Sequence, residues 1–240
     1  MLKYNGSILK VNNGQSIIGS VTLSPLYPSD MDFIYLANNF DGSKIPNVIT
    51  TSDMGPYLKS GNITKNGSGS SCYLSNGLVY SNFLYIDLTT TRLNAMKASN
   101  STYTYFIRVY APSNGTGGIA CFRNTDSNYK YMIRVGSNKV EVHGTAGTLT
   151  LSLDPNKVFK ITINGANAVV NDLEGTTQTV NITTTREMGS RMTTFLAGVN
   201  NSVYANEGKL DRFYGIAGIA RATTDAEDRL IKAYLMSQGV

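Results

Sequence analysis

The feature that most constrains the fold is an alternation of apolar and polar residues with a period of two. In TYTYFIRVY (102–110), one side of a strand would carry Tyr103, Tyr105, Ile107 and Val109, and KVEVH and VFKITIN repeat the pattern. Successive side chains of a strand point to opposite faces, so this period indicates strands. Turn signals such as Asn-Gly and Asp-Pro-Asn separate the runs, as in antiparallel sandwiches. The sequence therefore predicts an all-β fold, an antiparallel two-sheet jelly-roll sandwich.

One short helix is expected in the closing stretch GKLDRFYGIAGIARATTDAEDRLIKAYL (208–235). Thr224 and Glu227 have the spacing of a capping box, and acidic residues in the first turn suit the positive end of the helix dipole. An apolar stripe follows helical spacing through Ala226, Leu230, Ile231, Tyr234 and Leu235. The preceding run, Arg212 to Ala220, is apolar on both faces and predicts a strand deep in a sheet. We expect the helix beside the sandwich, over a sheet edge or an open end.

The chain of 240 residues is long enough for one sizeable core. We expect one sandwich domain over residues 21–240, preceded by a polar arm or adaptor segment over residues 1–20. No stretch approaches the roughly 18 apolar residues of a membrane span, and the N-terminus has no apolar region of a secretory signal. Neither membrane insertion nor secretion through such a signal is therefore expected.

The closing stretch resembles the corresponding segment of concanavalin A-like lectin/glucanase domains, in the laminin G-like group. TYTYFIRVYAP and VFKITINGANAVVNDLEG are similar to strand and turn segments of the same family, and the resemblance extends from Phe83 to Gln238. It implies a jelly-roll sandwich with a short helix after its last strands. It also implies carbohydrate binding, glycoside hydrolysis in some branches and adhesion or scaffolding in others.

The Asn-, Ser-, Thr- and Gly-rich composition and the opening LKYNGSILKV resemble proteins of tailed-bacteriophage particles. This resemblance implies a viral protein of the virion, assembled in the host cytoplasm as part of a tail or capsid appendage. Its partners would be host cell-surface polysaccharide or neighbouring virion proteins. A homo-oligomer would fit the second kind of partner.

A search for catalytic residues finds no complete motif. Glycoside hydrolysis generally needs two carboxylates that flank the scissile bond, and the Glu-x-Asp-x-Glu strand of the glucanase branch is absent. The run Asp172-Leu173-Glu174 is interpreted as a turn, and Asp30-Met31-Asp32 as a solvated edge. The sole histidine, His143, is expected at an exposed strand end. We therefore expect no catalytic residues and no enzyme, with a glycoside hydrolase as the least favoured alternative.

Candidate ligand-binding residues come from the tyrosines. Sugar C–H faces stack on aromatic rings; the chain has no Trp but has 15 Tyr. Two predicted strands carry Tyr103, Tyr105, Tyr129 and Tyr131, which could form one ligand-binding stripe. The alternative is that these four rings belong to a half-buried core.

The sequence contains few candidate residues for a metal site or a disulfide. Cys72 and Cys121 are too few for a disulfide framework or a zinc site, so two free thiols are expected, with a single bridge as the alternative. The loop 124–128 (NTDSN) offers oxygen ligands for calcium, although such loops are usually turns. No cofactor and no defined metal site are assigned.

Nucleic-acid binding is not expected, although the net charge is +5. In YKYMIR (129–134), strict alternation would place Lys130, Met132 and Arg134 on one face and the tyrosines on the other. A nucleic-acid platform needs cations and aromatic rings on the same exposed face. The sequence therefore leaves two main hypotheses: a non-catalytic carbohydrate-binding or adhesion module, and a purely structural virion protein.

Overall fold

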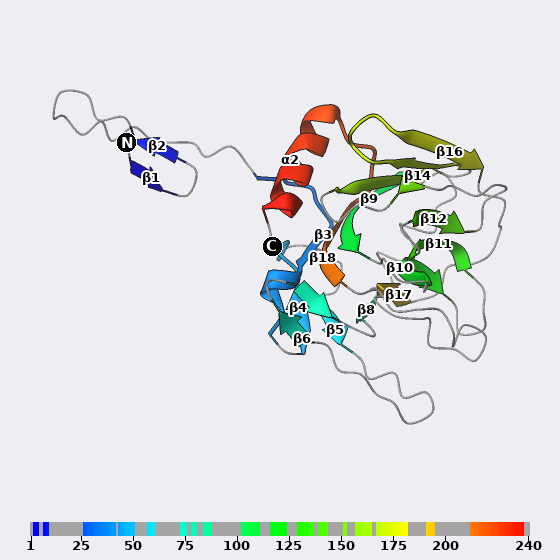
Figure 1. Cartoon of the computed structure of the whole chain (residues 1–240), viewed down its shortest axis with the longest axis horizontal. Coiled ribbons are helices and arrows are strands. Elements are labelled where there is room, and N and C mark those ends of the chain that lie inside the picture. The colour runs from blue at the N-terminus through cyan, green and yellow to red at the C-terminus, as the bar shows by residue number, and fades with distance from the viewer. Residues whose placement is uncertain are drawn as a thin grey trace.

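Figure 1 shows the chain as a computed structural model. The structure describes the following residues: 2–4, 7–9, 26–41, 43–50, 57–60, 73–75, 78–80, 84–87, 102–110, 116–123, 129–136, 139–143, 151–152, 157–164, 167–181, 191–194 and 212–237. Side chains are described in a subset of these: 26–41, 43–50, 102–109, 157–164, 167–179, 181 and 213–237.

Two large sheets make up the body of the molecule. The first, called the helix-bearing sheet, contains in spatial order β16 (Thr177–Asn181), β15 (Asn167–Asn171), β14 (Phe159–Asn164), β9 (Thr102–Tyr110), β18 (Arg212–Ile219), β7 (Leu78–Tyr80) and β6 (Tyr73–Ser75), with β3 (Phe33–Leu36) also paired to β18. The other, called the second sheet, has the order β13 (Leu151–Ser152), β12 (Lys139–His143), β11 (Tyr129–Gly136), β10 (Thr116–Arg123), β17 (Arg191–Thr194), β8 (Leu84–Asp87), β5 (Tyr57–Ser60) and β4 (Lys44–Pro46).

The strand pairs in these sheets are antiparallel. The Asn164-Gly165 signal was a correct hairpin prediction, because β14 and β15 pair directly, with Asn164 opposite Asn167. β3 leads through the 3-10 helix η1 (Ala37–Asn39) to β4, so the two sheets are joined at one corner. The predicted all-β antiparallel sandwich with a short C-terminal helix is confirmed.

The core lies against both faces of the helix-bearing sheet. The face toward the second sheet carries side chains that are almost completely buried, among them Tyr35, Tyr105, Ile107, Phe159 and Phe213. The alternate residues of the same strands form a second cluster under the helix, which includes Ile34, Leu36, Phe106, Val158, Ala217 and Ile219. Burial on both faces requires a cover on each side, which the second sheet and the helix provide (Figure 1).

The helix α2 (Asp225–Met236) begins as the sequence predicts. The Thr224 side chain accepts from the Glu227 backbone, and the Glu227 side chain accepts in return from the Thr224 backbone. The predicted stripe is narrower than expected, because Ile231 and Leu235 are buried whereas Leu230 is 38% exposed. The predicted position over a sheet edge or open end is wrong, since α2 lies against the central strands β9 and β18. Gly215 on β18 lets the helix approach closely, because a Cβ at that position would lie only 3.1 Å from Leu235 Cδ2.

At the N-terminus, β1 (Leu2–Tyr4) and β2 (Ser7–Leu9) pair with each other in a two-stranded sheet of their own. Residues 10–25 lie outside the described residues, so the domain boundary at residue 20 stays a prediction. Among the described residues, no helix has the length and apolar character needed to cross a membrane.

Candidate functional site

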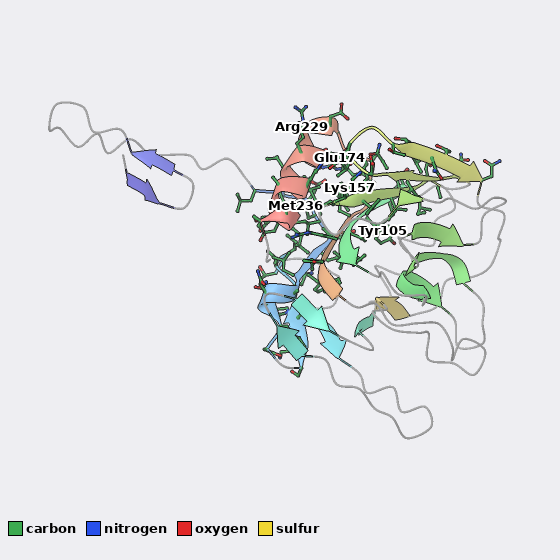
Figure 2. All side chains as sticks on the ribbon, in the orientation of Figure 1. Tyr105, Lys157, Glu174, Arg229 and Met236 are labelled. Atoms are coloured by element: carbon green, nitrogen blue, oxygen red, sulfur yellow. The ribbon has the colours of Figure 1, made fainter. Side chains whose placement is uncertain are left out.

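Two of the four predicted ligand-binding tyrosines lie in the core. Tyr103 is 3% exposed and Tyr105 is fully buried; both belong to the β9 face that is turned toward the second sheet. Their ring centroids are 4.8 Å apart, and the Tyr103 hydroxyl donates a 2.7 Å hydrogen bond to Asp32 Oδ2. Figure 2 shows Tyr105 in the interior of the molecule. In these positions the two rings stabilise the core and are closed to a ligand from solution.

The other two predicted tyrosines belong to the second sheet. Tyr129 and Tyr131 lie on β11, so the four tyrosines come from different sheets. The side chains of these two residues lie outside the described ones. A shift in register between β10 and β11 pairs Cys121 with Met132 but Arg123 with Tyr129. Tyr129 therefore shares a face with Arg123, and strict alternation along β11, as the sequence suggested, is wrong at this point.

The two faces of the second sheet are distinguished by β4. Ile45 is fully buried, Lys44 is partly exposed and Pro46 is exposed, so Ile45 belongs to the core face. Residues directly opposite each other on paired strands lie on the same face, so the register extends this assignment across the sheet. The face that contains Lys44 is called the outer face. It carries Lys44, Pro46, Tyr57, Lys59, Tyr85, Asp87, Cys121, Arg123, Tyr129, Met132, Arg134, Lys139, Glu141, His143, Arg191 and Thr193.

The composition of the opposite face supports this assignment independently. The residues that share the face of Ile45 are mostly apolar, and include Leu58, Ile86, Phe122, Ile133, Val140, Val142 and Met192. A sheet with one face in the core and one face toward solvent has this division. The register and the residue types therefore agree on which face is outward.

The outer face combines cationic and aromatic residues. One row across the sheet contains Lys44, Lys59, Tyr85, Thr193, Cys121, Met132 and His143, in that order. The adjacent row contains Arg191 and Arg123, which are directly opposite each other, with Asp87 opposite Arg191 and Tyr129 opposite Arg123. Sequence reasoning missed this site because its members come from strands spread over residues 44–193. The common signal is that polar, cationic or aromatic residues occupy most of the alternate positions in these strands, with Pro46 and Met132 among the exceptions.

Several cations near the helix are paired with carboxylates. Lys157 Nζ lies 3.2 Å from Asp172 Oδ2 and 3.1 Å from Glu174 Oε2, and Lys232 Nζ lies 3.1 Å from Glu174 Oε1. Figure 2 shows Lys157 and Glu174 beside α2. Lys160 Nζ lies 2.7 Å from Oδ2 of the buried Asp228. These contacts attach α2 and the β15–β16 turn to the sheet.

The predicted turn at Asp172-Leu173-Glu174 is confirmed. Asp172 Oδ1 accepts from the backbone N–H groups of Glu174 (2.9 Å) and Thr176 (3.0 Å), and Leu173 adopts a positive φ of 58°. Burial acts to raise the pKa of the Asp172 carboxyl, but the two backbone donors and Lys157 outweigh it and lower the pKa to about 2. Its position in the turn identifies Asp172 as a structural carboxylate.

The prediction of a solvated edge at Asp30-Met31-Asp32 is correct for Asp30 and wrong for Asp32. Asp30 is exposed and accepts from Arg221, whose guanidinium also lies 2.7 Å from Glu227 Oε1. Asp32 is 7% exposed, because it accepts the hydroxyl of Tyr103 in the core. The hydrogen bond from Tyr103 offsets part of the cost of burying the Asp32 carboxyl group.

Among the residues whose side chains the structure describes, Arg108 is the largest that is fully buried. It is 1% exposed, and its Nη1 donates to the carbonyl oxygens of Leu235 (3.3 Å) and Met236 (3.5 Å) at the end of α2. The guanidinium carbon also lies 4.3 Å from the centroid of the Tyr214 ring. A cation here lies at the negative end of the helix dipole and supplies a side-chain donor to its last carbonyls. Burial lowers the pKa of Arg108 from its usual value.

Other predicted sites fall outside the described residues. These are the loop 124–128 proposed for calcium, and Cys72; the state of the two thiols therefore stays a prediction. Within the described part of the chain, no group of three or more His, Cys, Asp or Glu is placed to hold a metal ion. His143 pairs with Met132 in the backbone register and belongs to the outer face.

Comparison with known proteins gives similarity in fold alone. No family model and no curated protein matches the sequence. A sialidase of Trypanosoma rangeli has a TM-score of 0.59 and 11% identity over 89% of this chain and 33% of that chain. The same sialidase in complex with sialic acid gives 0.57 and 10%, over 90% of this chain and 34% of that one. The binding domain of botulinum neurotoxin serotype D/C gives 0.54 and 14%, over 86% of this chain and 52% of that chain.

The chain therefore spans about a third of the length of the sialidases and about half of the toxin binding domain. These neighbours are consistent with an all-β, lectin-like sandwich. They also correct the expectation that the chain is not an enzyme, because sialidases are enzymes. That expectation relied on missing paired carboxylates, and sialidases are exceptions that use a tyrosine nucleophile. The absence of a carboxylate motif is thus no ground for excluding an enzyme.

Proposed function

We propose that this chain is a carbohydrate-binding domain that uses the outer face of the second sheet. The observation that carries the proposal is the register of that sheet, which groups Tyr57, Tyr85 and Tyr129 with lysines and arginines on one face. Aromatic rings provide stacking surfaces for the C–H faces of sugars, and nearby polar groups fix the hydroxyls. Tyrosine can perform the first role in a chain that has no Trp.

The fold comparisons support this proposal in general terms. One neighbour is a binding domain of a neurotoxin, and another is a sialidase in complex with sialic acid. Because one fold can serve many functions, the outer face carries more of the argument than the fold does. The resemblance of the closing stretch to concanavalin A-like, laminin G-like domains points in the same direction.

A bacteriophage virion is the proposed setting. The support is compositional, namely the resemblance to tailed-phage proteins, and the partner would then be a polysaccharide of the host surface. In this setting Tyr129 is the one tyrosine of the predicted four for which the register supports a binding role. Co-purification with a particle but no sugar affinity would instead favour a structural virion protein.

The proposal is tested with a panel of soluble polysaccharides, neutral and anionic, by depletion of the protein from solution. Saturable depletion by at least one member is expected. Tyr85→Ala and Tyr129→Ala should each weaken it about five- to tenfold, since a lost stacking contact costs about 1 kcal/mol. Tyr85→Phe and Tyr129→Phe keep the rings and should retain binding. No saturable depletion by any member, or equal binding by the Ala variants, would overturn the proposal.

A further inference from the structure

We infer that the chain has a second carbohydrate site, which binds a neutral polysaccharide on the solvent side of strands β14, β15 and β16. This site belongs to the helix-bearing sheet and is separate from the outer face of the second sheet. It is called the amide face. Its members follow from the strand register and are Lys160, Thr162, Asn164, Asn167, Val169, Asn171, Thr177, Thr179 and Asn181.

The amide face is the side of these strands that is turned away from the second sheet. Alternate residues of the same strands, such as Ile161 and Val170, are buried in the core between the sheets. The helix lies over one end of the amide face, where Lys160 contacts Asp228, and Figure 1 shows β16 extending away from α2. Beyond the helix, the members that are exposed to solvent are Asn164, Asn167, Thr177, Thr179 and Asn181.

Charge on the amide face is neutralised within the chain. Lys160 is its one ionisable member, and Lys160 Nζ lies 2.7 Å from Asp228 Oδ2. The other members carry hydroxyl, amide or aliphatic side chains. An anionic polymer or a nucleic acid would therefore find no cation here that lacks a carboxylate partner, whereas such ligands depend on ion pairs for much of their affinity. The charge of the amide face thus matches an uncharged ligand.

Three exposed asparagines form one row across the amide face. Asn164 is directly opposite Asn167, which is directly opposite Asn181. Among the residues that the structure describes, none accepts from or donates to these three side-chain amides, whereas the Asn171 amide donates to Thr177 Oγ1 at 2.7 Å. Each free amide offers two N–H donors and a carbonyl acceptor, and adjacent strands repeat it about every 4.8 Å. Sugar hydroxyls both donate and accept, so this row can bind them in succession.

The next row supplies an apolar contact. Val169 is half-buried and lies between Thr162 and Thr179 in the register, about 7 Å along the strands from the asparagine row. Its methyl groups can contact the C–H groups of a sugar whose hydroxyls bind the amides. Single small ligands usually need a concave site, whereas an open sheet face contacts one side of a longer chain. The amide face therefore favours a polymer, in which weak contacts are repeated.

A protein partner is less suited to this surface. The centre of a protein–protein interface is typically apolar and rich in aromatic residues. Val169 is the one aliphatic member of the amide face, and none of its members has a ring. A second copy of the chain is therefore an alternative that the experiment tests.

The experiment measures binding of the full chain to four immobilised neutral polysaccharides: dextran, amylose, laminarin and galactomannan. Saturable binding to at least one of them is expected. Added NaCl should leave this binding unchanged, because no ion pair with the ligand is involved. Loss of the binding with added NaCl, or no binding to any of the four, would overturn the inference.

The main variant combines Asn167→Ala with Asn181→Ala and is called the asparagine pair. It should weaken binding about tenfold, since two hydrogen-bonding groups are lost. Thr179→Val is a second variant that suits a strand and removes one hydroxyl, and it should weaken binding about two- to threefold. Asn38→Ala with Asn39→Ala is the matched control, because both residues are exposed in η1 and lie outside the amide face. Thermal melting verifies that each variant is folded.

The asparagine pair is also combined with Tyr85→Ala and Tyr129→Ala, so that this inference and the proposed function can fail separately. Loss of neutral binding with the tyrosine changes, but not with the asparagine pair, would overturn the amide face and leave the outer face standing. Loss with the asparagine pair alone would support the amide face and overturn the outer face for that ligand.

Two further outcomes would overturn the inference. Equal loss in the control at Asn38 and Asn39 would show that the effect does not depend on the amide face. Analytical ultracentrifugation tests the second copy: a dimer of the unchanged protein that the asparagine pair dissociates would assign the amide face to contact between chains. A monomer in both cases is expected.

Discussion

The face of the helix-bearing sheet beneath α2 and the outer face of the second sheet differ in how charged residues are placed on them. Beneath α2, Arg108 is enclosed and donates to the last carbonyls of the helix, and Lys160 contacts Asp228. On the outer face, Lys44 is opposite Lys59 and Arg123 is opposite Arg191. The first arrangement serves stability, because its charges have partners in the chain. The second places like-charged residues at paired positions of the backbone register, where such pairs destabilise a sheet unless other groups offset their charge.

The largest effect on stability is expected in the packing between the sheets. A Cβ on Gly218 would lie 2.4 Å from Phe33 Cε1 and 3.1 Å from Tyr103 Cε1, and Phe33 is fully buried. Gly218→Ala should therefore lower the free energy of unfolding by about 3 kcal/mol, the upper part of the usual range for overpacking. Urea unfolding measures the change.

Gly215→Ala is the matched control for this substitution. Its Cβ would meet side-chain ends of Leu235 and Leu36 at 3.1 and 3.3 Å and the Tyr35 carbonyl oxygen at 3.2 Å, so a smaller cost is expected. Equal effects of the two variants would show that the packing around Phe33 is less tight than the contacts indicate.

The next largest effect is expected at Arg108. Arg108→Met keeps an apolar stem but leaves the carbonyls of Leu235 and Met236 without this donor. The free energy of unfolding should fall by about 1–3 kcal/mol, and the amides of α2 should exchange faster with solvent. Hydrogen exchange followed by mass spectrometry measures the second effect.

Lys59→Gln on the outer face sharpens the comparison. It should change the free energy of unfolding by less than about 0.5 kcal/mol, because the register pairs Lys59 with the partly exposed Lys44, and substitutions on such a face usually have small effects. If Lys59→Gln destabilised the protein as much as Arg108→Met, the contrast between the two faces would fail.

The smallest effect is expected at Asp172, and it depends on pH. The folded-state pKa of about 2 is below the usual value of 3.8, so the ionised carboxylate stabilises the fold. This contribution, about 2 kcal/mol at most, is present above pH 4 and is lost as the pH falls from about 4 to 2. Asp172→Asn should thus be less stable at pH 7 by about 1–2 kcal/mol and similar to the unchanged protein near pH 2. Thermal melting across this range would contradict the assignment if the difference were independent of pH.

Local patterns were the most predictable part of this molecule. The capping box at Thr224 and Glu227 depends on residues three apart, and the structure has both of its hydrogen bonds. The turn at Asp172 and the strand at 212–219 follow from short-range signals in the same way. In each case the determining contacts lie within a few residues.

The remaining features depend on partners that are distant in sequence. Asp32 is buried because Tyr103, 71 residues away, donates to it. Tyr129 changes face because of a register shift relative to β10, which alternation within β11 could not reveal. The outer face was missed for the same reason, since strand order decides which cations become neighbours. The position of α2 also depends on residues that are distant in sequence, because Ile231 and Leu235 pack in one buried cluster with Phe106 and Ala217.

The position of β18 has a consequence for the order in which the chain is synthesised. This strand occupies the middle of its sheet, with β9 on one side and β3 and β7 on the other. Residues 33–36 therefore have no partner in β18 until residues 215–218 have been synthesised. Such non-local pairing slows folding and leaves strand edges unpaired in the interval. A chain that ended before residue 212 would lack the partner shared by β3, β7 and β9 and would leave these strands with unpaired edges.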